Sequence, residues 1–356
     1  MHKPRSVRDA DVAGKRVLVR VDFNVPLEEG KVADDTRIRA ALPTIKLLLE
    51  KGASNVICCS HLGRPKGIAD PKFSLKPVAA RLAELLGREV AFGDPSAQVC
   101  VLENTRYVAG ETKNNLEYAK QLAALADVYV NDAFGSAHRA HSSTEAVAHL
   151  LPAYAGLLLE KELDELGKLL GEVERPFVVI VGGLKVEDKI GVLRKLGERA
   201  DDLLIGGKMA EQVYAANPVG REVELPDDTV IGDRFAADAD TKVADYFDVP
   251  EGWERYDIGP HTRERFCAII AKAKTIFWNG PMGVFEFPKF AAGTRAVAEA
   301  VAESGAHSVV GGGDVVRAIE EAGVADRISW VSTGGGASLE LLEGKELPGV
   351  LAIPEA

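Results

Sequence analysis

The sequence of 356 residues lacks the features that mark several classes of protein. It has no lysine- or arginine-rich run of the kind that binds nucleic acid, and its 54 acidic residues outnumber its 43 basic ones. No apolar run approaches the roughly 20 residues of a membrane helix, and the first residues lack the apolar segment of a signal peptide. We therefore expect a cytoplasmic protein with neither a nucleic-acid nor a membrane partner.

Motifs for disulfide, zinc and common nucleotide-binding chemistry are also missing. The four cysteines, Cys58, Cys59, Cys100 and Cys267, show no CxxC spacing, which favours reduced thiols in the core. Neither GxxxxGK[ST] nor GxGxxG followed by VAIK and HRD is present. The chain is therefore neither a P-loop enzyme nor a protein kinase.

Short β-branched runs alternate with amphipathic segments along the whole chain. The runs lie at 16–21, 55–59, 127–130, 177–181, 202–205, 275–278 and 308–310, and the helix-like segments at 37–51, 75–86, 114–125, 186–199, 262–273 and 291–304. This alternation indicates βαβ units and an α/β fold with mainly parallel sheets.

A leucine-rich segment near the middle of the chain divides it into two parts. The sequence "GLLLEKELDELGKLLGEVERP" at 156–176 repeats leucine at helical spacing and ends at a proline. We expect a long helix over 156–171 that joins an N-terminal domain, 1–155, to a C-terminal domain, 172–344. The alternative is one more crossover helix of a single sheet.

Basic and polar residues follow the apolar strands of the first domain. These residues are Asp22, Asn24, Arg37, His61, Arg64, Arg106 and Arg139. Loops at the carboxyl ends of parallel strands face one crevice. Two guanidinium groups about 6 Å apart repel by roughly 3 kcal/mol at an effective dielectric near 20, so such a cluster needs an anion. Singly, each arginine could be an ordinary surface charge.

The stretch "AFGSAHRAHSS" at 133–143 places Arg139 between two histidines. The spacing of His138 and His141 could supply two metal ligands, but zinc usually takes three or four. Arg139 would repel a cation, whereas its planar fork suits carboxylate or phosphate. We therefore interpret this stretch as part of an anion site.

Glycine-rich turns end four strands of the second domain, at Gly182–Gly183, Gly280, Gly311–Gly313 and Gly334–Gly336. Glycines let backbone N–H groups approach an anion, although one such turn is often only tight packing. Lys185 and Lys189 are expected on one face of the helix at 186–199, where a phosphate would relieve their repulsion. Asp314 could cap the next helix or bind Mg²⁺.

Taken in order, these motifs resemble the phosphoglycerate kinase family over essentially the full chain. They are "RVDFNVP", "SHLGRP", "LEN-R", "NDAFG-AHRAHSS", "VGG-KVEDKI", "WNGPMGVFE", "GGGD" and "STGGGASLELLEGKELPGV". The resemblance implies two Rossmann-like domains with mainly parallel sheets, joined by a long interdomain helix. It also implies that the tail, 345–356, returns to the first domain, and that the chain is a monomer.

The resemblance implies two ligand sites. The acid-substrate site, for 3-phosphoglycerate or 1,3-bisphosphoglycerate, would comprise Asp22, Phe23, Asn24, Arg37, His61, Leu62, Gly63, Arg64, Arg106 and Arg139. The nucleotide site would comprise Gly183, Lys185, Lys189, Asn279, Pro281, Glu286, Gly312, Gly313, Asp314, Val315, Gly334, Gly335 and Gly336, with Asp314 holding the Mg²⁺ of ADP or ATP. Arg37 and Lys185 would be the catalytic residues.

The implied activity is reversible phosphoryl transfer from 1,3-bisphosphoglycerate to Mg-ADP, which gives 3-phosphoglycerate and ATP in glycolysis and gluconeogenesis. In-line transfer needs reacting atoms near 3–3.5 Å, so the two domains are expected to close. Leu184, Lys208, Val315 and Trp330 depart from the family pattern. The alternative is a catalytically impaired paralogue that binds anions or nucleotides as a regulator.

Overall fold

The computed structural model describes residues 2–356 and contains two compact units. Unit 1 comprises the chain up to Asp164 together with Glu346–Ala356, and unit 2 comprises Glu165–Lys345. The division falls inside helix α4 (Leu157–Leu170). A helix is therefore present where one was expected, at 156–171, while its role as the link between two domains stays a prediction.

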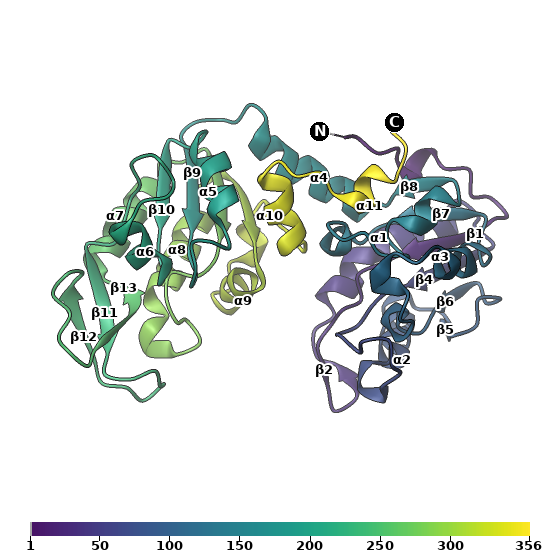
Figure 1. Cartoon of the computed structure of the whole chain (residues 1–356), viewed down its shortest axis with the longest axis horizontal. Coiled ribbons are helices and arrows are strands. Elements are labelled where there is room, and N and C mark those ends of the chain that lie inside the picture. Colours follow the sequence, from purple (N-terminus) through teal and green to yellow (C-terminus); the bar gives the residue numbers. More distant parts are fainter. Residues whose placement is uncertain (1) are drawn as a thin grey trace. The chain divides into compact units, whose positions relative to one another are not determined.

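Unit 1 is built on a parallel sheet of six strands in the order β5-β6-β4-β1-β7-β8 (Figure 1). The strands are β1 (Arg16–Arg20), β4 (Asn55–Cys59), β5 (Ala91–Phe92), β6 (Val99–Val101), β7 (Val128–Asn131) and β8 (Ala153–Ala155). Arg20 ends the central strand and pairs with Cys59 on one side and Asn131 on the other. The chain crosses from one half of the sheet to the other beside β1, and crevices for ligands form at such a switch point.

Three helices of unit 1 accompany this sheet: α1 (Thr36–Glu50), α2 (Lys76–Leu86) and α3 (Leu116–Ala123). In α1, Ile38, Ala41, Ile45 and Leu48 are buried at intervals of three or four residues, as expected for one helical face against a sheet. Strands β2 (Leu27–Glu28) and β3 (Lys31–Val32) form a small antiparallel ribbon.

The C-terminal tail is part of unit 1. The backbone N–H of Gly349, in α11 (Pro348–Leu351), donates to the Ala137 carbonyl at 2.9 Å, and Asn131 Nδ2 donates to the Gly349 carbonyl at 3.1 Å. A Cβ at Gly349 would lie 3.0 Å from the Ala137 Cα, so this close approach favours glycine. The tail therefore supports the segment that leads to Arg139, and both ends of the chain lie at this unit (Figure 1).

Unit 2 contains a parallel sheet of five strands in the order β10-β9-β14-β15-β16. The strands are β9 (Phe177–Val181), β10 (Asp202–Ile205), β14 (Thr275–Asn279), β15 (His307–Gly311) and β16 (Trp330–Val331). The helices are α5 (Ile190–Gly197), α6 (Met209–Ala215), α7 (Pro260–Ile270), α8 (Ala292–Glu303), α9 (Gly313–Glu321) and α10 (Gly336–Leu342). All five residues of β9 and of β14 are buried, which agrees with their continuous apolar sequence.

A second, antiparallel sheet of unit 2 has the order β12-β11-β13 and was not predicted. Its strands are β11 (Asp228–Gly232), β12 (Thr241–Asp245) and β13 (Glu254–Ile258). Four of the five residues of β12 are exposed, so its sequence carries no apolar run.

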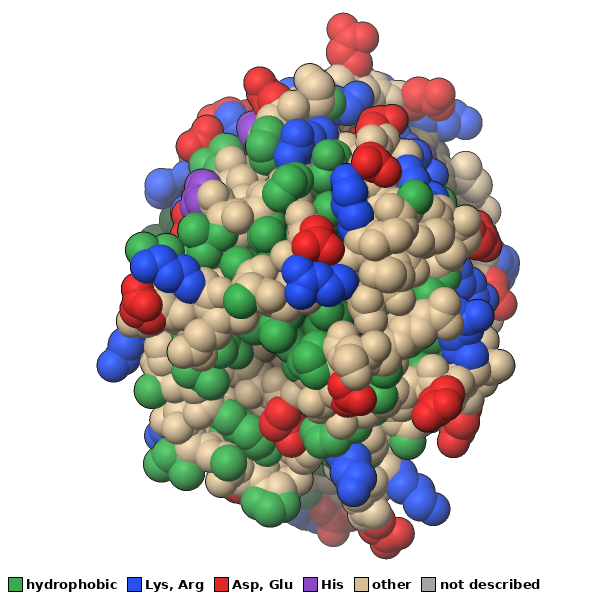
Figure 2. Space-filling view, turned by 90° about the vertical axis from the view of Figure 1, so that its right-hand side faces the viewer, with side chains coloured by type: hydrophobic (Ala, Val, Ile, Leu, Met, Phe, Trp, Pro, Cys, Tyr) green, Lys and Arg blue, Asp and Glu red, His purple; other side chains and the backbone are tan. Residues whose placement is uncertain are grey.

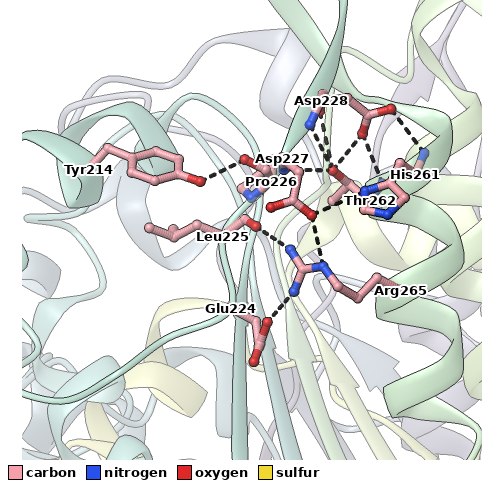
Figure 3. Close-up of polar contacts among 9 residues, drawn as sticks. All are labelled: Tyr214, Glu224, Leu225, Pro226, Asp227, Asp228, His261, Thr262 and Arg265. Carbon is pink, nitrogen blue, oxygen red and sulfur yellow. Dashed lines mark hydrogen bonds and ion pairs between the residues drawn. The ribbon is translucent and has the colours of Figure 1, made fainter. Parts of the chain in front are cut away.

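Hydrogen bonds fix this small sheet to α7 (Figure 3). The carboxylate of Asp228 accepts from the backbone N–H groups of His261 and Thr262, each at 2.9 Å, and thereby caps the helix. Arg265, about one turn further along α7, donates to Asp227 at 2.9 Å and also contacts Glu224 and the Leu225 carbonyl. The segment 224–228, which leads into β11, is therefore hydrogen-bonded to α7 at both of its ends.

The predicted α/β class with mainly parallel sheets is confirmed. Within residues 2–356, no helix has the length and apolar character needed to cross a membrane. On the face shown in Figure 2, basic and acidic side chains are interspersed.

One predicted helix begins later than expected. Helix α5 starts at Ile190, and residues 186–189 form bends and turns instead of the first helical turn. The interpretation of Lys185 and Lys189 as neighbours on one helical face was therefore wrong. Both lysines belong to the loop that connects β9 to α5.

Candidate active site

A cavity of about 1000 Å³ lies at the carboxyl ends of β9, β14 and β15 in unit 2. Among the residues predicted for the nucleotide, it is lined by Gly183, Lys185, Lys189, Asn279, Pro281, Glu286, Gly312, Gly313, Asp314, Val315 and Gly335. The small antiparallel sheet contributes further walls, including Thr229, Tyr256 and Asp257. The loops predicted to bind phosphate therefore face one cavity.

Two of the glycine turns pack directly against each other at this cavity. A Cβ at Gly182 would lie 2.0 Å from the Pro281 carbonyl oxygen, and one at Gly280 would lie 2.1 Å from the Gly182 carbonyl oxygen. Gly280 also has a φ of +91°, which L side chains rarely adopt. These contacts require glycine, so the close approach of the β9 and β14 turns is fixed by the sequence.

The side chain of Lys189 forms hydrogen bonds to both of these turns. Its Nζ donates to the Gly182 carbonyl at 2.6 Å and to the Asn279 carbonyl at 3.4 Å. Burial lowers the pKa of Lys189 to about 8, against the attraction of the Asp314 and Asp188 carboxylates. In contrast, Lys185 is exposed, and its side chain makes no hydrogen bond or ion pair with another described residue.

Asp314 lies in the first turn of α9 and lines the cavity. The N-cap of α9 is Gly312, with a φ of +96°, and Asp314 lies two residues further on, inside the helix, so it is not the capping residue. Within residues 2–356, no group of three or more His, Cys, Asp or Glu side chains could hold a metal ion. A single carboxylate suits Mg²⁺, which keeps several waters and takes other ligands from substrate phosphates.

The charges of neighbouring arginines in unit 1 act on Arg106. Burial, followed by the charges of Arg20 and Arg139, lowers the pKa of Arg106 to about 10. The Arg106 side chain donates from Nη1 to the Gly63 carbonyl at 2.9 Å, while its buried Nε has no hydrogen-bond partner among the described residues. A buried guanidinium with an unused donor is suited to an anion.

Asp22 and Asn24 hold the loops of this cluster together. Arg37 Nη1 lies 3.2 Å from Asp22 Oδ2 and donates to the Asn24 carbonyl at 3.2 Å. Asn24 Oδ1 accepts from the Gly63 N–H at 2.9 Å. The loops after β1 and β4 are therefore joined through the same residues that were predicted to contact the acid substrate.

A buried ionic network lies directly behind these loops. Arg20 has no exposed surface, and its Nε donates to Ser143 Oγ at 2.8 Å. Ser143 Oγ in turn donates to the Glu111 carboxylate, which is also fully buried. Arg20 Nη2 lies 3.1 Å from His61 Nδ1, so the network reaches the predicted site.

Known proteins are similar to this chain in sequence and in fold. A family model described as phosphoglycerate kinase matches residues 7–224 and 213–345. Curated phosphoglycerate kinases from two strains of Chloroflexus aurantiacus are each 53% identical to this chain over an alignment 397 residues long. Each alignment covers 99% of this chain and 99% of the relative. The chain belongs to the phosphoglycerate kinase family.

Solved structures of the family have the same fold. Phosphoglycerate kinase from Coxiella burnetii is 37% identical with a TM-score of 0.85, and the enzyme from Pyrococcus horikoshii is 32% identical with a TM-score of 0.85. Each comparison covers 98% of both chains. The chain is therefore a phosphotransferase of glycolysis that uses a carboxyl group as acceptor, and it transfers a phosphoryl group reversibly between 1,3-bisphosphoglycerate and ADP.

Three residues predicted for the sites have their side chains in the hydrophobic cores. Phe23 and Leu62 are buried in the core of unit 1, and Val315 is buried in the core of unit 2. Only their main-chain atoms can face a ligand. Val315 departs from the family pattern, but its side chain packs in the core of unit 2, so a serine there would bury an additional polar group.

Sequence reasoning missed the residues that support the acid-substrate site from behind. Arg20, Glu111 and Ser143 lie in the buried network, and Asn104 donates to the Leu62 carbonyl at 2.7 Å and accepts from the Arg106 N–H at 3.0 Å. The signal for Arg20 was available, since a second arginine follows the apolar run "VLV" within the strand "RVLVR". Glu111 lies in a turn with no apolar pattern and gave no such signal.

The histidines of this region predict a pH dependence of stability. Burial, followed by the charges of Arg106 and Arg20, lowers the pKa of His141 to about 4, whereas an unfolded histidine titrates near 6.5. Between these values the unfolded chain binds more protons, so stability is lost as the pH falls through this window. We expect His141→Asn to flatten the decrease in melting temperature between pH 6.5 and 4.5. An unchanged slope would contradict this role of His141.

Proposed function

We propose that the arginine cluster of unit 1 binds the acid substrate and that the cavity of unit 2 binds ADP or ATP. The observation that carries this proposal is the charge of the cluster. The cluster comprises five guanidinium groups, those of Arg20, Arg37, Arg64, Arg106 and Arg139, and it includes the carboxylates of Asp22, beside Arg37, and Glu111, near Arg20 and Arg106. The excess of positive charge suits 3-phosphoglycerate, whose carboxylate and phosphate carry about three negative charges near neutral pH.

The transfer step needs positioning and charge neutralisation but no general base. A carboxylate with an ordinary pKa near 4 is already ionised at neutral pH and can act as the nucleophile. Charge in the transition state spreads over the equatorial oxygens of the phosphoryl group. Arg37 from unit 1 and Lys185 from unit 2 are the proposed catalytic residues, because each places a charge at its own ligand site, Arg37 from the first turn of α1 and Lys185 from the loop after β9.

The nucleotide phosphates are proposed to contact the glycine turns of unit 2. Gly183, Gly312, Gly313 and Gly335 present main-chain atoms to the cavity, and Gly334 and Gly336 flank the last of them. Asn279, Pro281 and Glu286 line the same cavity. When bound with the nucleotide, Mg²⁺ would neutralise phosphate charge, and Asp314 would be the protein residue that holds it.

We further propose that the protein acts as a cytoplasmic monomer in which the two units close during turnover. The acid-substrate residues and the nucleotide residues belong to different compact units. Two ligands held in this way can reach an in-line separation of about 3–3.5 Å only when the units bring them together. The alternative of an impaired regulatory paralogue gains no support from the comparisons.

A coupled assay tests the proposed function. Purified protein with 1,3-bisphosphoglycerate, ADP and Mg²⁺ should form ATP, detected through hexokinase and glucose-6-phosphate dehydrogenase. A folded protein without turnover would favour the regulatory alternative.

Arg106→Ala should weaken 3-phosphoglycerate binding by roughly 10- to 100-fold, since a hydrogen bond to a charged group contributes about 1.5–3 kcal/mol. Calorimetric titration measures this change, and the affinity for ADP should stay the same. Arg88→Ala, an exposed arginine beyond α2, is the control and should leave both affinities unchanged. Equal effects of the two substitutions would contradict the proposed site.

Removal of the metal or of its proposed ligand should affect only the nucleotide. Excess EDTA should abolish turnover, and Asp314→Ala should weaken the binding of Mg-ADP by at least about tenfold, because the remaining ligands would be phosphate and water. Titration with 3-phosphoglycerate should be unaffected. An Asp314→Ala enzyme with the Mg²⁺ dependence of the parent would show that the carboxylate does not hold the metal.

A further inference from the structure

Gln212 contacts the loop of Lys185 on both sides of that residue. Its Nε2 donates to the Leu184 carbonyl at 2.9 Å, and its Oε1 accepts from the Val186 N–H at 2.9 Å. Gln212 lies on α6, the helix that follows β10. The side-chain amide therefore pairs with the main chain in the way that a neighbouring strand would.

These two hydrogen bonds have a specific geometric consequence for Lys185. The Leu184 carbonyl belongs to the peptide plane before the Lys185 Cα, and the Val186 N–H belongs to the plane after it. Because φ and ψ of a residue are the rotations that relate its two flanking peptide planes, holding both planes restrains both angles. The direction of the Lys185 Cα–Cβ bond is then set by one side chain of α6.

The loop has few other restraints at this point. Leu184, Lys185, Glu187 and Asp188 are exposed, and the preceding Gly183 has a φ of +124°. Val186 is buried, and its carbonyl accepts from the Lys189 N–H at 3.0 Å, but neither contact holds the plane that precedes Lys185. The Leu184 carbonyl is held by Gln212.

Helix α6 is itself fixed to the cavity wall, so it can serve as a reference for the loop. The Met209 N–H donates to the Gly183 carbonyl at 3.0 Å, and the Gly207 N–H donates to the Met282 carbonyl at 3.0 Å. Two ion pairs also join α6 and its N-cap residue to β13, Lys208 with Glu254 and Glu211 with Arg255, each at 3.8 Å. Gln212 therefore restrains the Lys185 backbone relative to a helix that is itself fixed.

We propose that Gln212 is a positioning residue for phosphoryl transfer, acting through Lys185. This inference rests on the catalytic role proposed for Lys185. A long, exposed lysine side chain has many rotamers, and its charge stabilises the transition state only when its backbone points it toward the transferring group. Gln212 makes no contribution of charge and acts by restricting the direction from which Lys185 reaches into the cavity.

The test is a double-mutant cycle between Gln212 and Lys185, with turnover measured at saturating substrates. Gln212→Ala should lower kcat by roughly 10- to 100-fold, with an unchanged KM for 3-phosphoglycerate and a melting temperature within a few degrees of the parent. Gln212→Glu keeps only the acceptor for the Val186 N–H, so its kcat should lie between those of Gln212→Ala and the parent. In a Lys185→Ala background, Gln212→Ala should change kcat by less than about twofold.

Gln121→Ala is the control, because Gln121 is an exposed glutamine on a helix of unit 1. Its kcat should equal that of the parent. Equal losses from Gln212→Ala in the presence and absence of Lys185 would overturn the inference, as would a lower melting temperature with unchanged kcat. A Lys185→Ala enzyme with full turnover would instead show that the proposed function of Lys185 itself is wrong.

Discussion

Lys185→Ala should lower turnover by roughly 10²- to 10³-fold, because removal of one preorganised charge at a reacting centre costs about 3–4 kcal/mol of transition-state stabilisation. The side chain is exposed at the cavity and has no described partner, so its removal leaves no buried group unsatisfied. The fold should therefore be unaffected. Steady-state kinetics and a thermal melt on the same preparation separate the two effects.

The control for this substitution is Lys195→Ala, which removes an exposed lysine from α5 without changing the cavity. Arg37→Ala should resemble Lys185→Ala in its effect on kcat. It should also release Asp22, whose carboxylate lies 3.2 Å from Arg37 Nη1. If the activity of Lys185→Ala were lost only together with the melting transition, Lys185 would have a structural role and no catalytic one.

Arg20→Ala should destabilise the protein by roughly 3–5 kcal/mol, since it leaves the buried Glu111 carboxylate without its compensating charge. Both side chains have no exposed surface, and burial already raises the pKa of Glu111 despite the charge of Arg20. The substitution also removes the donors to Ser143 Oγ and to the Val21 carbonyl. Chemical denaturation measures the loss of stability.

Arg16→Ala provides a matched comparison on the same strand. Arg16 forms an exposed ion pair with Asp127 at 2.8 Å, and such pairs contribute about 0–1 kcal/mol. The double substitution Arg20→Met with Glu111→Leu should recover much of the stability lost in Arg20→Ala, because it removes both buried charges. Equal destabilisation by Arg16→Ala and Arg20→Ala would contradict the importance of the buried network.

The parallel sheets were predictable because their strands are buried on both faces. "FVVIV" and "DLLI" form β9 and β10 with the predicted limits. A short apolar run bounded by turn residues is typical of a buried strand and is too short for most helices. The antiparallel sheet was missed for the opposite reason, because "TKVAD" in β12 is largely exposed and owes its conformation to pairing with β11. Local sequence cannot show a strand that only a distant partner stabilises.

The candidate sites were predictable in composition but only partly in geometry. Strand ends indicated where Arg37, Arg106 and the glycine turns would lie, since parallel strands present their carboxyl ends at one edge. The start of α5 was wrong, because Lys189 turns back to donate to Gly182 and Asn279 before the helix begins. The role of Gln212 could not be read from the sequence, because it depends on the placement of α6 beside a loop far from it in the chain.

The charge imbalance of the arginine cluster also affects the folding equilibrium of unit 1. Guanidinium groups held together without enough carboxylates oppose the compact state, and this cost is present before any substrate arrives. An anion that binds only the folded form offsets it, by about 2.7 kcal/mol at a concentration one hundred times its Kd. The abundance of small phosphorylated acids would thus influence how much of the enzyme survives in the folded form, in addition to how fast it turns over.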